Sequence, residues 1–154
     1  MKFFILNGPG LNLLHYEEPG LPGSVSYDGL LDYIESCCKK LGIETEFYQS
    51  NHEGDLIDEI QNAQGRVDGI VLNAGGYAQT SVALLDALRA AGLPAVEVVI
   101  DDLREKEPFR KTDLVALGCQ GRFIGEGLQG YVHACAYLAQ LIRIDAQRGM
   151  HIAN

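Results

Sequence analysis

Two short apolar runs, each followed by a turn rich in glycine and asparagine, place the strongest constraint on how this chain can fold. Residues 3–6 precede a turn at 7–10, and residues 69–72 precede a turn at 73–76. Such runs are typical of parallel strands that are buried on both faces of a sheet. Ligands bind in the crevice beyond the carboxyl ends of such strands, so the two turns predict a small-molecule site.

Strand and helix patterns alternate along the rest of the chain. Alternation of this kind implies parallel pairing with right-handed crossovers, hence an α/β fold in three layers around a five-stranded parallel sheet. We expect a single domain over residues 1–154, with a tail at 144–154 that is frayed or packed on a neighbouring subunit. The predicted strands are 2–6, 43–49, 67–72, 95–100 and 122–124, and the predicted helices are 30–41, 53–64, 80–91 and 128–142.

The composition excludes several classes of function. The net charge of −9 argues against a nucleic-acid partner, since phosphate binding needs clustered lysine and arginine. No apolar run is long enough to span a membrane and no signal peptide is recognisable, which predicts a cytoplasmic location. The cysteines lack the spacing of a zinc site, so we expect reduced thiols and no metal. These cysteines are Cys37, Cys38, Cys119 and Cys135.

Two segments interrupt the regular alternation of strands and helices. Residues 15–26 form a connection longer than usual after the first strand, and long loops in small domains are often lids. Residues 101–113 carry dense charge after the fourth strand. Both segments leave the carboxyl ends of strands, so both are expected to overhang the same crevice.

Short stretches in a fixed order carry a family resemblance over nearly the whole chain. They are residues 5–14, 49–54, 73–77, 80–84, 96–98, 107–110 and 129–131. In residues, order and spacing they resemble the type II 3-dehydroquinate dehydratases. The resemblance implies a flavodoxin-like fold, trimers assembled into a dodecamer, and a lyase of the shikimate pathway that needs no cofactor. It also implies anti elimination of water from 3-dehydroquinate through an enolate, without a metal or an imine.

The resemblance assigns roles to residues that this chain retains. Asn12 matches an asparagine that orients a water molecule at the enolate, and Glu97 matches a glutamate that supports the catalytic histidine. Asn73 and Arg110 match contacts to substrate hydroxyl groups, and Asp86 matches an acidic residue presented by a neighbouring subunit. The remaining expected substrate-binding residues are Gly75, Tyr77, Ser81 and Ile100.

The groups that transfer protons in the family are replaced here. The family lid has an arginine and a tyrosine where this chain has Glu17 and Pro22. The histidine after the fourth strand is Val99, a carboxylate-binding serine is Asp101, and a pocket histidine is Gln79. General acid–base catalysis contributes roughly 10²–10⁴-fold per group, so standard dehydroquinate dehydration is predicted to be weak or absent.

Other residues could supply a proton carrier. Glu17 and Asp101 are candidate catalytic acids or bases, the alternative being that both are solvated loop charges. If both face the pocket, its ligand should be neutral or cationic. His15 lies near the crevice in sequence and could supply a new acid, whereas Tyr16 and Tyr27 flank the lid.

Three functional hypotheses follow from these residues. The first is a divergent enzyme that acts on a small oxygenated ligand by enolisation or elimination, with standard activity weak or absent. The second is a non-catalytic small-molecule-binding or assembly protein. The third is a genuine 3-dehydroquinate dehydratase with relocated catalytic residues, in which Tyr16 or Tyr27 is the base.

Overall fold

The central sheet of the computed structural model has five parallel strands, as predicted. The structure describes residues 1–152, with side chains described through residue 149. The strand order β4-β1-β5-β6-β7 is the doubly wound, flavodoxin-like order. The strands are β1 (Lys2–Asn7), β4 (Glu44–Gln49), β5 (Gly69–Asn73), β6 (Ala95–Val99) and β7 (Gly121–Ile124).

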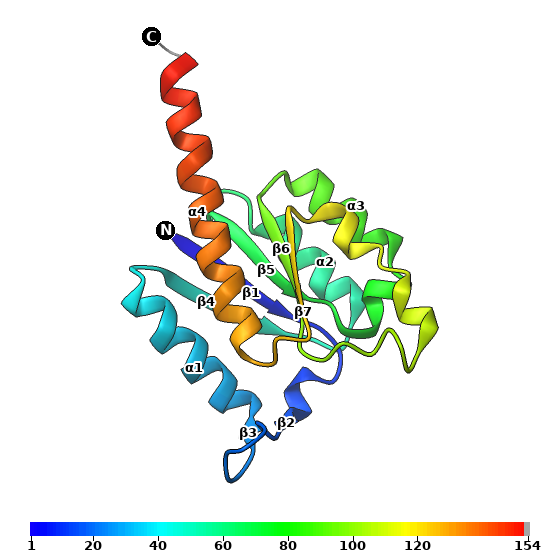
Figure 1. The fold of residues 1–154 in the computed structure, drawn as a ribbon. Helices are drawn as coiled ribbons and strands as arrows, with labels where there is room; N and C mark the ends of the chain where they lie inside the picture. The colour runs from blue at the N-terminus through cyan, green and yellow to red at the C-terminus, as the bar shows by residue number, and fades with distance from the viewer. Residues whose placement is uncertain (153–154) are drawn as a thin grey trace.

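Helices cover both faces of this sheet and complete the three predicted layers. α1 (Tyr27–Lys40) and α4 (Gln129–Ile152) pack on one face, and α2 (Glu53–Asn62) and α3 (Val82–Ala91) pack on the other (Figure 1). Each face buries its own apolar cluster, so the strands are apolar on both sides. Short 3₁₀ turns fill the connections: η1 (Leu11–Leu13), η2 (Gly75–Gln79), η3 (Pro108–Lys111) and η4 (Val115–Gly118).

The sequence determines these helices through apolar spacing and capping. In α1 the buried residues Leu30, Ile34 and Cys38 recur every four positions, which places them on one face. Ser26 caps this helix, because its hydroxyl accepts a hydrogen bond from the Gly29 amide at 3.2 Å. At the carboxyl end of α3, Gly92 adopts the left-handed conformation with φ 64°, and the helix ends there.

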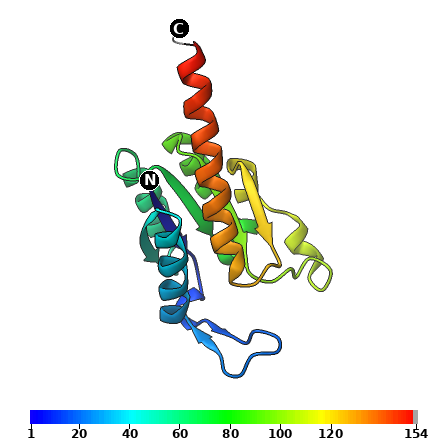
Figure 2. The ribbon, with the colours of Figure 1, turned by 60° about the vertical axis from the view of Figure 1, so that its left-hand side comes forward.

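The last helix corrects one prediction. The tail from residue 144 was expected to be either frayed or packed on a neighbouring subunit, and it is not frayed: α4 continues without a break to Ile152 and projects beyond the sheet (Figures 1 and 2). Its last described side chains are exposed to solvent, which explains why no apolar period marked them. Packing of this segment on a neighbouring subunit stays a prediction, and residues 153–154 lie outside the described part.

The two glycine-rich turns meet at the carboxyl ends of β1 and β5. The Gly8 amide donates a hydrogen bond to the Asn73 carbonyl at 2.7 Å. A Cβ atom at Gly8 would lie 2.6 Å from the Ala74 carbonyl oxygen, so only glycine allows this approach. The predicted convergence of the two turns is therefore present in the fold.

The predicted lid is a separate hairpin. β2 (His15–Tyr16) and β3 (Val25–Ser26) pair antiparallel, and the loop between them extends away from the body of the protein (Figure 2). Within residues 1–152, no helix combines the length and the apolar character that crossing a membrane requires.

Candidate active site

A small cavity opens beyond the carboxyl ends of β5, β6 and β7. The turn at 73–79 forms one wall, and the charged loop at 101–104 forms another. Its volume of about 80 Å³ is well below the 300–1,000 Å³ of typical ligand pockets. A ring-sized ligand is therefore larger than the cavity in this conformation. The remaining lining residues are Glu97, Val99, Arg110, Asp113, Arg122 and Ile124.

A buried hydrogen-bond network fixes the orientation of Asn73. Tyr131, on α4, accepts a hydrogen bond from Asn73 Nδ2 at 3.0 Å and donates one to Asn7 Oδ1 at 2.7 Å. Asn73 Oδ1 in turn accepts a hydrogen bond from the Gly75 amide at 3.2 Å. An amide has two donor hydrogens and two acceptor lone pairs, so Asn73 keeps capacity to contact a ligand.

Glu97 forms the centre of a charged cluster in the cavity wall. It lies directly opposite Arg122 in the pairing of β6 with β7, and Arg122 Nε donates to Glu97 Oε2 at 2.8 Å. Arg122 Nη2 also donates to Asp113 Oδ2 at 2.6 Å, so one guanidinium joins two carboxyl groups. The Glu97 side chain is fully buried, and its Oε1 has no hydrogen-bond partner among the described residues.

The surroundings of Glu97 favour its protonated form. Burial, then a side-chain hydrogen bond with the Asp113 carboxyl group and the charge of that group, raise the pKa of Glu97 to about 8, although Arg122 acts in the opposite direction. A carboxyl group with this pKa carries its proton at neutral pH. Burial also raises the pKa of the neighbouring Cys119 thiol to about 12. Cys119 is therefore a neutral neighbour of this cluster.

The other arginines of the cavity are engaged with acidic residues. Arg104 donates two side-chain hydrogen bonds to Asp102, at 2.8 and 2.7 Å, and these bonds lower the pKa of Asp102 to about 2. Arg110 pairs with Glu107 and donates to Gln79 Oε1 at 3.1 Å. No described side chain forms a hydrogen bond or ion pair with Asp101, which lines the same cavity.

Five predicted site residues line this cavity together. Asn73 is the last residue of β5, Gly75 begins the turn after it, Glu97 comes from β6, Asp101 from the loop after β6, and Arg110 from η3. The sequence therefore located the carboxyl ends of the strands correctly as the cavity walls.

Asn12, Tyr77 and Ser81 do not line this cavity. Asn12 is exposed on η1, where its Oδ1 accepts a hydrogen bond from Gln49 at 3.3 Å. The Tyr77 hydroxyl points to another turn and donates to the Asn51 carbonyl at 2.8 Å. Ser81 is buried and caps α3, accepting from the Leu84 amide at 2.9 Å. Their hydrogen-bond partners hold these three side chains away from the cavity of the single chain.

Two further predicted binding residues also lie elsewhere. Ile100 packs in the apolar cluster between the sheet and the α1–α4 layer, because alternate residues of a strand face opposite sides. Asp86 is exposed on α3 and does not line the cavity of its own chain. Its predicted contact with a neighbouring subunit stays a prediction.

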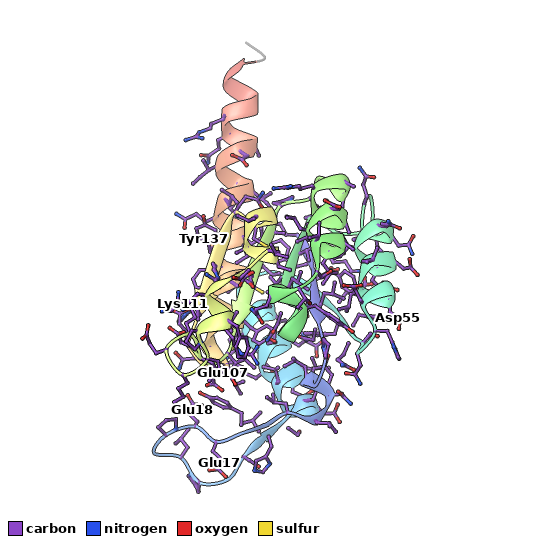
Figure 3. The ribbon with its side chains drawn as sticks, turned by 90° about the vertical axis from the view of Figure 1, so that its right-hand side faces the viewer. Glu17, Glu18, Asp55, Glu107, Lys111 and Tyr137 are labelled. Atoms are coloured by element: carbon purple, nitrogen blue, oxygen red, sulfur yellow. The ribbon has the colours of Figure 1, made fainter. Side chains whose placement is uncertain are left out.

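Glu17 does not face the cavity. Its side chain is 77% exposed on the lid, 3.6 Å from His15 Nε2, and both residues line a separate hollow of the hairpin. Figure 3 shows Glu17 at the outer end of the lid, away from Glu107 beside the cavity. In this conformation Glu17 and His15 are exposed to solvent. For Glu17 this agrees with the alternative interpretation, that it is a solvated loop charge.

The tyrosines near the lid are also outside the cavity. The Tyr27 hydroxyl accepts a hydrogen bond from Asn7 Nδ2 at 3.4 Å, and burial raises the pKa of Tyr27. The Tyr16 hydroxyl lies against Gly127, where a Cβ atom would be only 2.5 Å from it. Among the residues that the structure describes, neither a tyrosine nor a histidine lines the cavity.

The sequence alone did not identify the partners of Glu97. Arg122 lies opposite Glu97 only because of the register between β6 and β7, and Asp113 arrives from the loop before η4. Neither position matched an expected site residue. The one feature of the sequence that could have indicated this pairing is Arg122 itself, because an arginine within a short, largely apolar strand needs an acidic partner.

Comparison with known proteins gives a consistent set of relatives. The sequence model of a family described as "Dehydroquinase class II" matches residues 1–139. The 3-dehydroquinate dehydratase of Fusobacterium nucleatum subsp. nucleatum is 44% identical over 143 residues, which cover 91% of this chain and 97% of that protein. The 3-dehydroquinate dehydratase of Caldicellulosiruptor bescii is 40% identical over 142 residues, covering 92% and 98%.

The fold has solved counterparts as well. The crystal structure of a type II dehydroquinase from Butyrivibrio crossotus superposes with a TM-score of 0.83 at 41% sequence identity. The match covers 90% of this chain and 97% of that chain. The similarity thus extends over most of the chain.

Proposed function

Because this chain belongs to the class II dehydroquinase family, we propose that it binds a small polyhydroxylated ligand in the cavity beyond β5, β6 and β7. We further propose that it acts there as a hydro-lyase, by elimination of water, with only weak activity on 3-dehydroquinate. The single observation that carries this proposal is the composition of the cavity wall. Asn73, Gly75 and Arg110 are present, whereas no described tyrosine or histidine lines it.

The retained residues support binding of an oxygenated ligand. Asn73 is held in place by Tyr131 and by the Gly75 amide, so its amide is preorganised to contact a hydroxyl or carbonyl oxygen. Arg110 enters from η3 on the other side of the turn, where it also contacts Gln79. Two polar groups on different elements can thus orient one ligand.

The missing proton carriers support weak standard activity. Val99 occupies the position where the family resemblance places a histidine, and Val99 lines the cavity without a titratable group. Pro22 occupies the position of the lid tyrosine, on a loop from which no residue lines the cavity. Loss of two acid–base groups reduces a rate by roughly 10²–10⁴-fold for each, although such effects are seldom additive.

Standard 3-dehydroquinate dehydration is the second candidate function. The identities of 40% and 44% to proteins named 3-dehydroquinate dehydratase favour it. It requires a base and an acid at the substrate, and no described tyrosine or histidine lines the cavity to serve as either. Closure of the lid is the motion that would bring Tyr16 or Glu17 to the substrate.

Proton exchange and water loss in D₂O test the proposal. The purified protein is incubated with a panel of small hydroxy ketones, and NMR follows deuterium exchange beside the carbonyl and formation of an enone. We expect exchange or elimination with at least one neutral hydroxy ketone, and its loss when Asn73 is replaced by alanine. Absence of binding and of exchange for every compound would contradict the proposal.

We also propose that the chain assembles into trimers and a dodecamer, on the basis of the family resemblance. The exposed position of Asp86 on α3 supports a contact with another subunit, since Asp86 does not reach the cavity of its own chain. A closed symmetric assembly would place such a residue at a repeated interface.

A further inference from the structure

Every arginine among the described lining residues of the cavity already has an acidic partner. Arg104 pairs with Asp102, Arg110 pairs with Glu107, and Arg122 bridges Glu97 and Asp113. A guanidinium has five N–H donors, so these pairs leave some donors free, but the charge of each arginine is already offset by a carboxylate. The cavity therefore offers no free cation to an anionic ligand.

Asp101 adds an unpaired negative charge at the same place. It lines the cavity, and no described side chain neutralises it. Asp101 is exposed to solvent, so a ligand carboxylate close to it would be repelled, but less strongly than beside a buried charge. Both observations disfavour an acid such as 3-dehydroquinate.

Glu97 offers the cavity a different kind of group. Its side chain is fully buried, lines the cavity, and leaves Oε1 without a hydrogen-bond partner among the described residues. A buried polar atom without a partner is costly, so a ligand oxygen that satisfies it contributes to binding. A protonated carboxyl group can donate a hydrogen bond to such an oxygen.

We propose that the cavity selects an uncharged ring ligand, a hydroxy ketone or polyol without a carboxylate, and that Glu97 binds it as a neutral acid. This inference rests on the proposed function and specifies its substrate class. In the complex, Glu97 donates its proton to a ligand oxygen in place of the Asp113 carboxyl group, while Asn73 contacts a second oxygen. Deprotonation of Glu97 removes the donor and adds a negative charge to the wall.

The groups that determine the protonation of Glu97 come from several elements. Asp113, on the loop before η4, favours the neutral form, and Arg122, on β7, favours the ionised form. Since the pKa of Glu97 is raised to about 8, the donor is present at neutral pH and is lost above that value. The other ionisable groups around the cavity and beside Glu97 are Asp101, Asp102, Arg104, Arg110 and Cys119.

Calorimetric titration with two related rings tests the inference. The probes are 2-keto-myo-inositol, a neutral hydroxy ketone, and 3-dehydroquinate, a hydroxy ketone that carries a carboxylate. We expect the neutral ring to bind at least ~10-fold more tightly at pH 6.5, a difference of about 1.4 kcal/mol. The affinity for the neutral ring should fall several-fold between pH 6.5 and 9.5.

Variants separate the contributions of the two carboxyl groups. Glu97→Gln retains an uncharged donor, so its affinity for the neutral ring should no longer depend on pH. Asp101→Asn should raise the affinity for 3-dehydroquinate several-fold. Glu35→Gln, an exposed substitution on α1, is the matched control and should behave as the unmodified protein does.

The outcomes distinguish this inference from the proposed function. Equal or tighter binding of 3-dehydroquinate by the unmodified protein overturns the inference and leaves the proposed function standing. An unchanged affinity for the neutral ring up to pH 9.5 overturns the role of Glu97, whether or not the variants fold. Failure of both rings to bind, together with the absence of exchange for all hydroxy ketones, overturns both proposals.

Discussion

Glu97 is the residue on which the properties of the cavity most depend. Its buried carboxyl group lies between Arg122 and Asp113, and its pKa is raised to about 8. A raised pKa in the folded state means that the folded protein binds this proton more strongly than the unfolded chain does. The resulting stabilisation is fully present below the ordinary pKa of a glutamate and is lost as the pH rises through about 8.

Glu97→Gln should therefore change how stability depends on pH. Glutamine cannot ionise, so the variant should gain free energy of unfolding relative to the unmodified protein as the pH rises from 5 to 9. We expect a relative gain of at least about 1 kcal/mol, or roughly 2–4 °C in Tm. Thermal denaturation at several pH values measures it. A difference that is constant across this range would show that Glu97 titrates normally.

Tyr131 is the residue that holds the two asparagines of the strand ends. Tyr131→Phe should leave Asn7 Oδ1 and Asn73 Nδ2 without their buried partner, at a cost of about 1–3 kcal/mol. Chemical denaturation measures this loss. Tyr137→Phe is a suitable control, since its hydroxyl bonds the Gln120 carbonyl in an exposed position and should cost less. Equal losses in both variants would argue against the network.

The site residues could be predicted only where the chain itself carried the signal. Asn73 and Gly75 follow a buried strand directly, so their position at the strand ends was readable. Arg122 meets Glu97 through the register of two strands, which no local pattern reports. Asn12 was expected in the site, but a hydrogen bond from Gln49 holds it on the outside of η1.

At the scale of elements, the lid and the end of β6 together determine whether standard chemistry is possible. Glu17→Arg and Pro22→Tyr in the lid, combined with Val99→His and Asp101→Ser after β6, would place the family's proton carriers in this chain. We expect this variant to gain at least ~10²-fold in turnover of 3-dehydroquinate. Enone absorbance measures the rate, and the lid pair alone serves as the control.

No gain in the combined variant, with its fold intact by circular dichroism, would contradict this account of the lid and of β6. A gain in the lid pair alone equal to that of the combined variant would exclude a role for Val99. Either result would mean that other residues of the cavity wall also limit the activity on 3-dehydroquinate.

Elements were predicted well where apolar residues repeat and poorly where they do not. The runs of β1 and β5 and the spacing in α1 identified these elements within a few residues of their bounds. The extension of α4 beyond residue 143 carries mostly exposed side chains, so the sequence there lacks the regular spacing of apolar residues that predicts a helix. It continues as a helix because the packed first half of α4 has already nucleated it.

At the scale of the whole molecule, the assembly can be measured directly. Twelve chains of 16.8 kDa would give a particle of about 200 kDa, and light scattering after size exclusion reports this mass. Asp86→Arg should reduce the mass if this residue lies at a subunit contact, whereas Glu35→Arg on α1 serves as the control. A monomer mass for the unmodified protein would contradict the proposed dodecamer.

The fold and the family place this protein among the class II dehydroquinases, and we propose that the lining of its cavity, which includes no described tyrosine or histidine, does not support their standard reaction. The most direct test is the rate at which the unmodified protein converts saturating 3-dehydroquinate, compared with the Butyrivibrio crossotus type II dehydroquinase under the same conditions. We predict a kcat at least ~10³-fold lower, because two acid–base groups are missing. A kcat within tenfold of that enzyme would contradict the account.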